Sequence, residues 1–391
     1  MLKKNLVIKY QELQKDLSFS KFTLVANDDG TIYYSKDGKS ASESTLQKYS
    51  TKGFRAKISA ELAKKGYRVI AIFSSPNTLR CGELGGIPTM LDDFTEIFGG
   101  NIVAVEKDEK KILKAIKKRN AVIVKDNCVI LTARSLDEAG TMSRIIEKNA
   151  FVMLKAKWFV TINPFISKCM NIGYTSYYSK INQQRVWQKE KTELIETVKI
   201  NPITIDDIEK ADKKTQDLLV AKKLYQDNYT QGTWGNVSIK IDDKTLYCTP
   251  KAIGYNLLKE DDIVTMNYLH NKQLSKGNKA TSEKGIHCRV MRERKDSYVV
   301  VHAHPTYSSI FAARNQNLEV SDSGKAVLGD IVYCSKHALP MTKRLANNTV
   351  DSMKTNAVFM GNHGVAVYGK DIREVFLVIE TLEKEAKQAL I

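Results

Sequence analysis

An internal repeat constrains the fold of this chain more than any other feature of its sequence. Residues 120–154 align without gaps to residues 356–390, with nine identities in 35 positions. Three shorter matches fall in the same order along the two halves, as expected of a duplicated unit. A chain of 391 residues also has the length of two ordinary domains. We therefore predict two domains of one fold, spanning residues 1–198 and 199–391.

The histidines are confined to the second copy, since all six lie at or after residue 270. His302 and His304 follow the apolar run 298–301, and alternation along a strand puts two residues at this spacing on one face. His363 stands in Gly-Asn-His-Gly between two apolar runs, which predicts a tight turn. Three histidines that leave a fourth position open form the pattern of a catalytic zinc site.

Two further motifs precede these histidines. Thr281, Ser282 and Glu283 open a predicted helix over residues 282–296, with Ser282 as its N-cap. Beside a metal, a carboxylate such as that of Glu283 can act as a general acid or base. The glycine-rich loop 231–238 precedes a predicted strand, and its backbone N–H groups could bind an anion.

Together these motifs resemble the class II aldolase/adducin family, over roughly residues 205–391. The resemblance implies an α/β fold, with three-layer αβα domains around a central, mainly antiparallel sheet, here two in tandem. It also implies a divalent metal, zinc or another ion such as Mn²⁺ or Co²⁺, on His302, His304 and His363. Glu283 corresponds to the acid/base residue of the family's aldolases.

The same resemblance implies a phosphate-binding group. Gly235 and Asn236 of the glycine-rich loop, with Thr281 and Ser282, correspond to residues that hold the substrate phosphate. A further phosphate loop of the family, TPTG-like, reads Thr-Pro-Lys-Ala here, so that Lys251 adds a flexible cation for a phosphate or a carboxylate. His287 also matches a family position, and we interpret it as structural.

The implied activity is that of a lyase that cleaves or forms a C–C bond in a small phosphorylated sugar through a metal-stabilised enediolate. Related epimerases carry Asp where this chain has Glu283, which favours aldol chemistry. The alternatives are an epimerase or decarboxylase on the same metal site, or a non-catalytic adducin-like assembly protein. The intact set of histidines argues against the assembly protein.

The first copy has lost every residue of this set. We therefore predict that residues 1–198 form a degenerate, metal-free domain kept for packing or assembly, or with a retained allosteric pocket. Its aromatic connecting segment, residues 155–204, is too rich in Trp, Phe and Tyr for a loose linker. The matched positions replace Glu283 by Thr51, His302 by Phe73, His304 by Ser75 and His363 by Asn127.

Composition limits the remaining function classes. The net charge is +17, carried by short lysine clusters without a nucleic-acid-binding motif, which argues against a nucleic-acid partner and favours anionic metabolites. No apolar run has the length of a membrane helix, and the N-terminal residues lack the apolar stretch of a secretory signal. Six scattered cysteines without a CxxC pair predict a cytoplasmic protein with reduced thiols. The resemblance implies a homo-oligomer.

Overall fold

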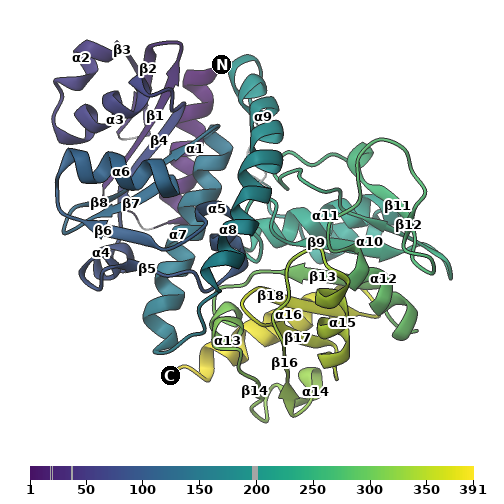
Figure 1. Ribbon diagram of the computed structural model, residues 1–391. Helices are drawn as coiled ribbons and strands as arrows, with labels where there is room; N and C mark the ends of the chain where they lie inside the picture. The colour runs from purple at the N-terminus through teal and green to yellow at the C-terminus, as the bar shows by residue number, and fades with distance from the viewer. Residues whose placement is uncertain (18, 20, 37, 196–200) are drawn as a thin grey trace. The chain divides into compact units, whose positions relative to one another are not determined.

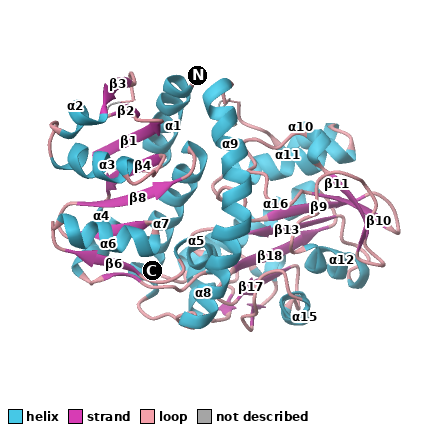
Figure 2. Cartoon of the chain, turned by 45° about the horizontal axis from the view of Figure 1, so that its top comes forward, coloured by secondary structure: helices cyan, strands magenta, loops and turns pink. Residues whose placement is uncertain are grey.

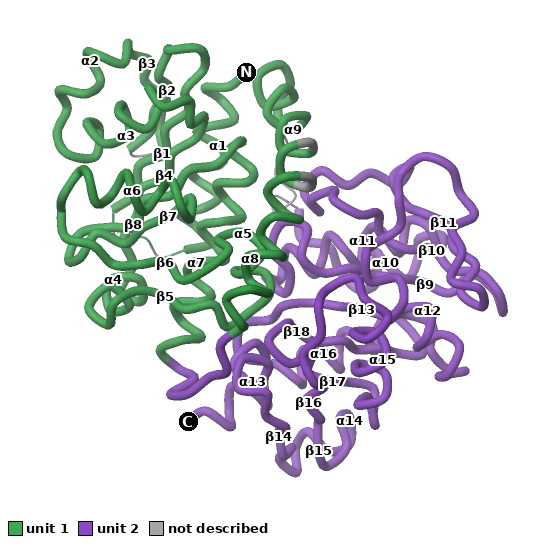
Figure 3. Tube along the Cα trace, viewed as in Figure 1, with its two compact units in different colours: residues 1–154, 162–197 green, residues 155–161, 198–391 purple. Residues whose placement is uncertain are grey.

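The computed structural model describes residues 1–391 except 18, 20, 37 and 196–200. Figure 3 shows that the chain divides into two compact units. Unit 1 contains Met1–Leu154 and Ile162–Thr197, and unit 2 contains Lys155–Thr161 and Val198–Ile391. The predicted boundary between residues 198 and 199 lies outside the described residues.

Unit 1 is built around one large sheet (Figure 1). Its strands are β1 (Lys21–Asp28), β2 (Thr31–Ser35), β3 (Ser42–Thr45), β4 (Val69–Ser74), β5 (Gly86–Ile87), β6 (Ile102–Val105), β7 (Ala121–Val124) and β8 (Cys128–Ala133). Its helices are α1 (Leu2–Asp16), α2 (Leu46–Ser50), α3 (Phe54–Lys64), α4 (Pro76–Glu83), α5 (Asp92–Phe98), α6 (Glu109–Arg119), α7 (Leu136–Ala156), α8 (Pro164–Gly173) and α9 (Lys180–Thr192), with a π-helical turn η1 (Tyr174–Ser179).

Unit 2 is built in the same way. Its strands are β9 (Asn236–Lys240), β10 (Thr245–Cys248), β11 (Val264–Asn267), β12 (Lys272–Gln273), β13 (Val299–Ala303), β14 (Leu318–Glu319), β15 (Ile331–Val332), β16 (Cys334–Ser335), β17 (Ala357–Met360) and β18 (Gly364–Gly369). Its helices are α10 (Ile205–Lys210), α11 (Lys213–Gln226), α12 (Lys284–Glu293), α13 (Ser308–Arg314), α14 (Lys325–Leu328), α15 (Lys343–Ser352) and α16 (Ile372–Gln388), with a 3₁₀ turn η2 (Glu260–Asp262).

Seven strands occupy the same order in the two sheets. Unit 1 has β3-β2-β1-β4-β8-β7-β6, and unit 2 has β11-β10-β9-β13-β18-β17-β16. In each series the final pair is parallel, β6 with β7 and β16 with β17, and the other pairs are antiparallel. The predicted α/β class with mainly antiparallel sheets is confirmed, and the shared order supports a tandem duplication.

Helices cover both faces of each sheet, as Figure 2 shows. In unit 2, Val299 and Val301 pack with α11 and α16, whereas Val300 packs on the opposite face with α12 and α15. This alternation gives the three layers. In unit 1, Ile70 and Ile72 pack with α3 and α6, and α1 and α7 lie on the other side of the sheet (Figure 1).

The strand registers correct one detail of the repeat. His302 pairs with Ala366, and Ala366 aligns with Ile130 of the first copy. Ile130 pairs with Ile72, whereas Phe73 pairs with Val129. Ile72, not Phe73, therefore holds the position of His302, and a metal ligand is absent at either residue.

Two general features bear on the protein's environment. No helix in the described part of the chain is long and apolar enough to cross a membrane. All six cysteines are free, and four of them are buried.

Candidate metal centre

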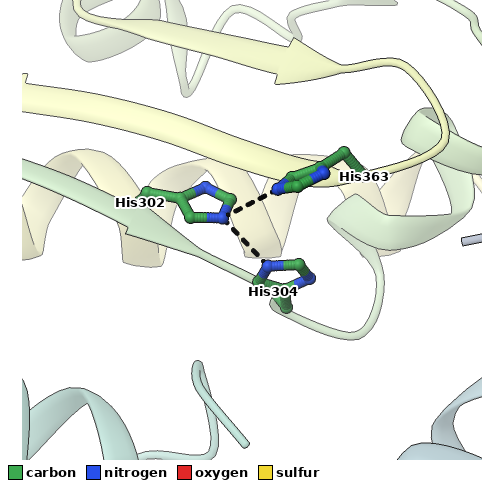
Figure 4. Close-up of side chains that lie close together, drawn as sticks. All are labelled: His302, His304 and His363. Atoms are coloured by element: carbon green, nitrogen blue, oxygen red, sulfur yellow. Dashed lines mark hydrogen bonds between the residues drawn. The ribbon is translucent and has the colours of Figure 1, made fainter. Parts of the chain in front are cut away.

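Three buried histidines converge in unit 2 (Figure 4). His302 is in β13, His304 follows that strand directly, and His363 lies in the turn between β17 and β18. The Nε2 atom of His302 is 3.0 Å from Nε2 of His304 and 3.1 Å from Nε2 of His363. His302 and His304 thus lie close together, as their i, i+2 spacing predicted, and the turn brings His363 to them.

The turn that carries His363 is held on both sides. Asn362 has a left-handed φ of 55°, which Asn tolerates better than most residues. Its Nδ2 donates to the carbonyl of Val160 at 2.7 Å, and its Oδ1 accepts from Nδ2 of Asn315 at 2.8 Å. A Cβ at Gly364 would lie 2.5 Å from the carbonyl oxygen of Ala303, so only glycine lets β18 approach β13 here.

Glu283 reaches the same centre from the start of α12. Its Oε2 lies 3.2 Å from Nε2 of His302, and its Oε1 lies 3.0 Å from Nε2 of His363. The predicted N-cap is wrong, because α12 begins at Lys284 and Glu283 occupies the cap position in place of Ser282. The Glu283 side chain makes no capping hydrogen bond, since it is turned toward the histidines.

The arrangement fits a divalent metal ion. Nδ1 of His302 lies 2.8 Å from the carbonyl oxygen of Val365, which can only accept, so Nδ1 carries a proton and the Nε2 lone pair faces the other histidines. Nitrogen ligands about 2.1 Å from a tetrahedral zinc ion lie about 3.4 Å apart, close to the separations in this cluster. A small rearrangement of the imidazoles, which widens these two separations slightly, would fit the donor set to an ion.

Glu283 is held as a carboxylate. Burial raises its pKa, but positive charge at His302 and His363, with hydrogen bonds from His363 and Asn236, outweighs that effect and holds the net pKa well below the usual range. A metal cation bound to neutral imidazoles would supply this positive charge in place of protons on the histidines. The group is therefore able to accept a proton at neutral pH.

A buried network, which sequence reasoning missed, orients this carboxylate. Nδ2 of Asn236 donates to Oε2 of Glu283 at 2.9 Å, so Oδ1 of Asn236 is left to accept from Nε2 of His287. Burial lowers the pKa of His287 to about 3, so the ring is neutral and its Nδ1 accepts from the hydroxyl of Ser238 at 2.7 Å. Two spacings could have signalled the network: Glu283 and His287 are one helical turn apart, and Asn236 and Ser238 share a strand face.

Removal of His287 should cost stability because it leaves the amide oxygen of Asn236 buried and unpaired. We expect His287→Ala to lower the free energy of unfolding by about 1–3 kcal/mol in urea denaturation. The matched control His270→Ala, in an exposed turn, should stay within about 0.5 kcal/mol of the parent chain. Equal stability of the two variants would show that the His287 hydrogen bonds contribute nothing net.

The residues predicted to bind phosphate differ in burial and in the contacts that hold them. Gly235 has a φ of 121°, and a Cβ there would come within 2.9 Å of the carbonyl oxygen of His302. Thr281 is buried, with its N–H donating to the carbonyl of Thr249 at 3.1 Å, and Ser282 beside it is half-buried.

The loop that carries Lys251 runs beside the same segment. The backbone N–H of Lys251 donates to the carbonyl of Lys279 at 2.7 Å, and Pro250 forms an isolated antiparallel β-bridge with Ala280. The ammonium group of Lys251 lies 3.7 Å from Sδ of Met341. Phosphate binding by Gly235, Asn236, Lys251, Thr281 and Ser282 stays a prediction.

Comparison with known proteins agrees with this geometry. The family model described as "Class II Aldolase and Adducin N-terminal domain" matches residues 218–390, which lie within unit 2. The L-fuculose phosphate aldolase of Methanocaldococcus jannaschii is 36% identical over 46% of this chain and 96% of its own length. The chain therefore belongs to the class II aldolase/adducin family, as its motifs predicted.

Two further relatives match a similar share of the chain. The 3-oxo-tetronate 4-phosphate decarboxylase of Haemophilus influenzae is 25% identical over 45% of this chain and 87% of its own length. A solved structure of an L-fuculose 1-phosphate aldolase is 30% identical, with a TM-score of 0.44, and covers 46% of this chain and 84% of its own. These matches each extend over about half of the chain.

Proposed function

We propose that unit 2 is a metal-dependent aldolase-type lyase that cleaves or forms a C–C bond in a small phosphorylated sugar. One observation carries the proposal: three buried imidazole nitrogens and the Glu283 carboxylate meet at one point. The kinship with a fuculose phosphate aldolase supports the reaction class and the phosphorylated substrate. Zinc suits the three-histidine donor set, and Mn²⁺ or Co²⁺ would suit the same geometry.

The histidines and Glu283 would have separate roles in this reaction. His302, His304 and His363 would hold the ion, which supplies a Lewis acid for the oxyanion that develops as the C–C bond breaks. Glu283 would take up or return the proton at the reacting carbon through its carboxylate, which Asn236 keeps in position.

Substrate binding would fall to the neighbouring loops. Gly235, Thr281 and Ser282 would orient the phosphate with backbone and hydroxyl donors, and Lys251 would add a charge near it. Orientation of this kind brings the reacting carbon within reach of Glu283.

A decarboxylase or an epimerase on the same site is the second candidate function. The decarboxylase relative favours it, because it matches over most of its length. Both reactions need the same two parts, a metal to stabilise an oxyanion and a group to move a proton. A non-catalytic adducin-like assembly role is disfavoured, since such a role gives no reason to keep three histidines and Glu283 together.

Product analysis distinguishes these activities. The full chain, reconstituted with zinc, would be incubated with L-fuculose phosphate and with 3-oxo-tetronate 4-phosphate, and the products followed by NMR. We expect an aldehyde and a three-carbon ketone phosphate, formed only with bound metal. Release of CO₂ would favour the decarboxylase, and inversion without cleavage the epimerase. Bound metal without turnover of either compound would favour the assembly role.

We also propose a homo-oligomeric, cytoplasmic enzyme in which unit 1 is a metal-free partner of unit 2. The free cysteines of the chain fit a reducing compartment. Light scattering coupled to size-exclusion chromatography tests the oligomeric state, and a strict monomer would contradict it.

A further inference from the structure

Unit 1 contains an open pocket of about 790 Å³ with a strongly basic lining. Five cationic side chains line it, whereas Asp126 is its single carboxylate among the described residues. Aromatic rings, including those of Phe22 and Phe54, form much of the remaining wall. The cations are Lys21, Lys36, Lys52, Arg55 and Lys107.

Two residues of the pocket lining correspond by alignment to residues of the unit 2 site. Asn127, in the pocket lining, aligns with His363, and each stands in the turn that joins two paired strands of its sheet. The residue before each has the same left-handed backbone, with a φ of 51° at Asp126 and 55° at Asn362. By the match of residues 50–53 with 282–285, Arg55 takes the position of His287.

The five cations form no ion pair among the described residues. None of them lies within 4.0 Å of a carboxylate oxygen among the described residues, whereas Lys57 on the same helix α3 pairs with Glu109 at 3.0 Å. Neutral groups hold them in place. Nη1 of Arg55 lies 3.4 Å from the backbone carbonyls of Lys21 and Ile72.

Two of the lysines contact aromatic side chains, Lys52 that of Tyr34 beside the pocket and Lys107 that of Phe54 in its lining. Lys52 donates to the hydroxyl of Tyr34, and this hydrogen bond lowers the pKa of Tyr34. Nζ of Lys107 lies 4.6 Å from the ring centroid of Phe54. Like charges gathered around one cavity repel each other unless a counter-charge enters, so the pocket favours an anion.

We propose that this pocket of unit 1 binds a small phosphorylated metabolite and does not transform it. The aligned positions have lost the histidines and the glutamate that could hold a metal or move a proton. Lysine and arginine side chains of the pocket supply the positive charge that attracts a phosphate. The aromatic wall would cover the carbon skeleton of the ligand. The proposal concerns unit 1 and does not depend on the activity of unit 2.

Inorganic phosphate is the probe for the test, titrated into the full chain by calorimetry at constant ionic strength. We expect the Lys52→Gln/Arg55→Gln variant to bind phosphate at least about tenfold more weakly, because two charge-assisted contacts are lost. The control Lys57→Gln/Lys64→Gln removes the same charge from helix α3, which also carries Arg55, at residues paired with Glu109 and Glu61, and should bind within about twofold of the parent chain.

Three outcomes would overturn the proposal. Equal weakening in both variants would indicate a diffuse charge effect, and no weakening would place the phosphate elsewhere. Acetate binding as tightly as phosphate would indicate a general anion site. Weaker phosphate binding in Lys251→Gln would identify phosphate bound in unit 2. Failure of the unit 1 proposal can therefore be told apart from failure of the proposed lyase. If the first variant unfolds, Lys36→Gln/Lys107→Gln replaces it.

Discussion

Protein carrying His302→Ala is expected to lose its bound metal. His302 is the central residue of the histidine cluster, since its Nε2 faces both other histidines and Glu283. Loss of an outer hydrogen-bond partner of a ligand already weakens metal affinity by about 10–100-fold, so loss of the ligand itself should exceed that. Elemental analysis of protein purified without chelator should give about one zinc ion per parent chain and almost none in the variant.

The control for this experiment is His270→Ala, which removes an exposed imidazole from the same unit. It should retain the metal of the parent chain, and circular dichroism should show both variants folded. Two ions per parent chain would contradict a metal-free unit 1. A parent chain without metal after reconstitution would contradict the lyase and favour the assembly role.

The clustering of the three histidines was predictable from sequence because their geometry is local. Alternation along a strand puts His302 and His304 on one face, and Gly361 and Gly364 mark the turn that presents His363. The approach of Glu283 is different, since nothing local ties the start of α12 to β13. The sequence suggested Glu283 as a carboxylate beside the metal, and the family resemblance gave it the acid/base role. The start of that helix was misplaced because the Glu283 side chain makes tertiary contacts in place of a cap.

The remaining misses also have physical causes. Every residue of β4 is buried, so no alternation of polar and apolar residues fixes which of Ile72 and Phe73 faces the site. The partners of His287 come from β9, far away in sequence. Lys21, Lys36 and Lys107 of the basic pocket in unit 1 come from separate segments of the chain. In the sequence alone, each looks like an ordinary solvent-exposed lysine.

Glu283→Gln tests the chemistry apart from the metal. The amide keeps the size of the side chain and an oxygen for Asn236, but it cannot accept a proton. Since a positioned acid or base contributes about 10²–10⁴-fold, kcat for the cleavage reaction should fall by about that factor. Metal content should remain that of the parent chain.

The matched control is Glu293→Gln, at the other end of α12, where the carboxylate forms a surface ion pair with Arg289 at 2.6 Å. Its turnover should stay within about twofold of the parent chain, because exposed ion pairs contribute little. Unchanged turnover in Glu283→Gln would mean that another group moves the proton. Loss of metal from that variant would show that the Glu283 carboxylate itself contributes to metal binding, as a ligand or through its contacts with His302 and His363.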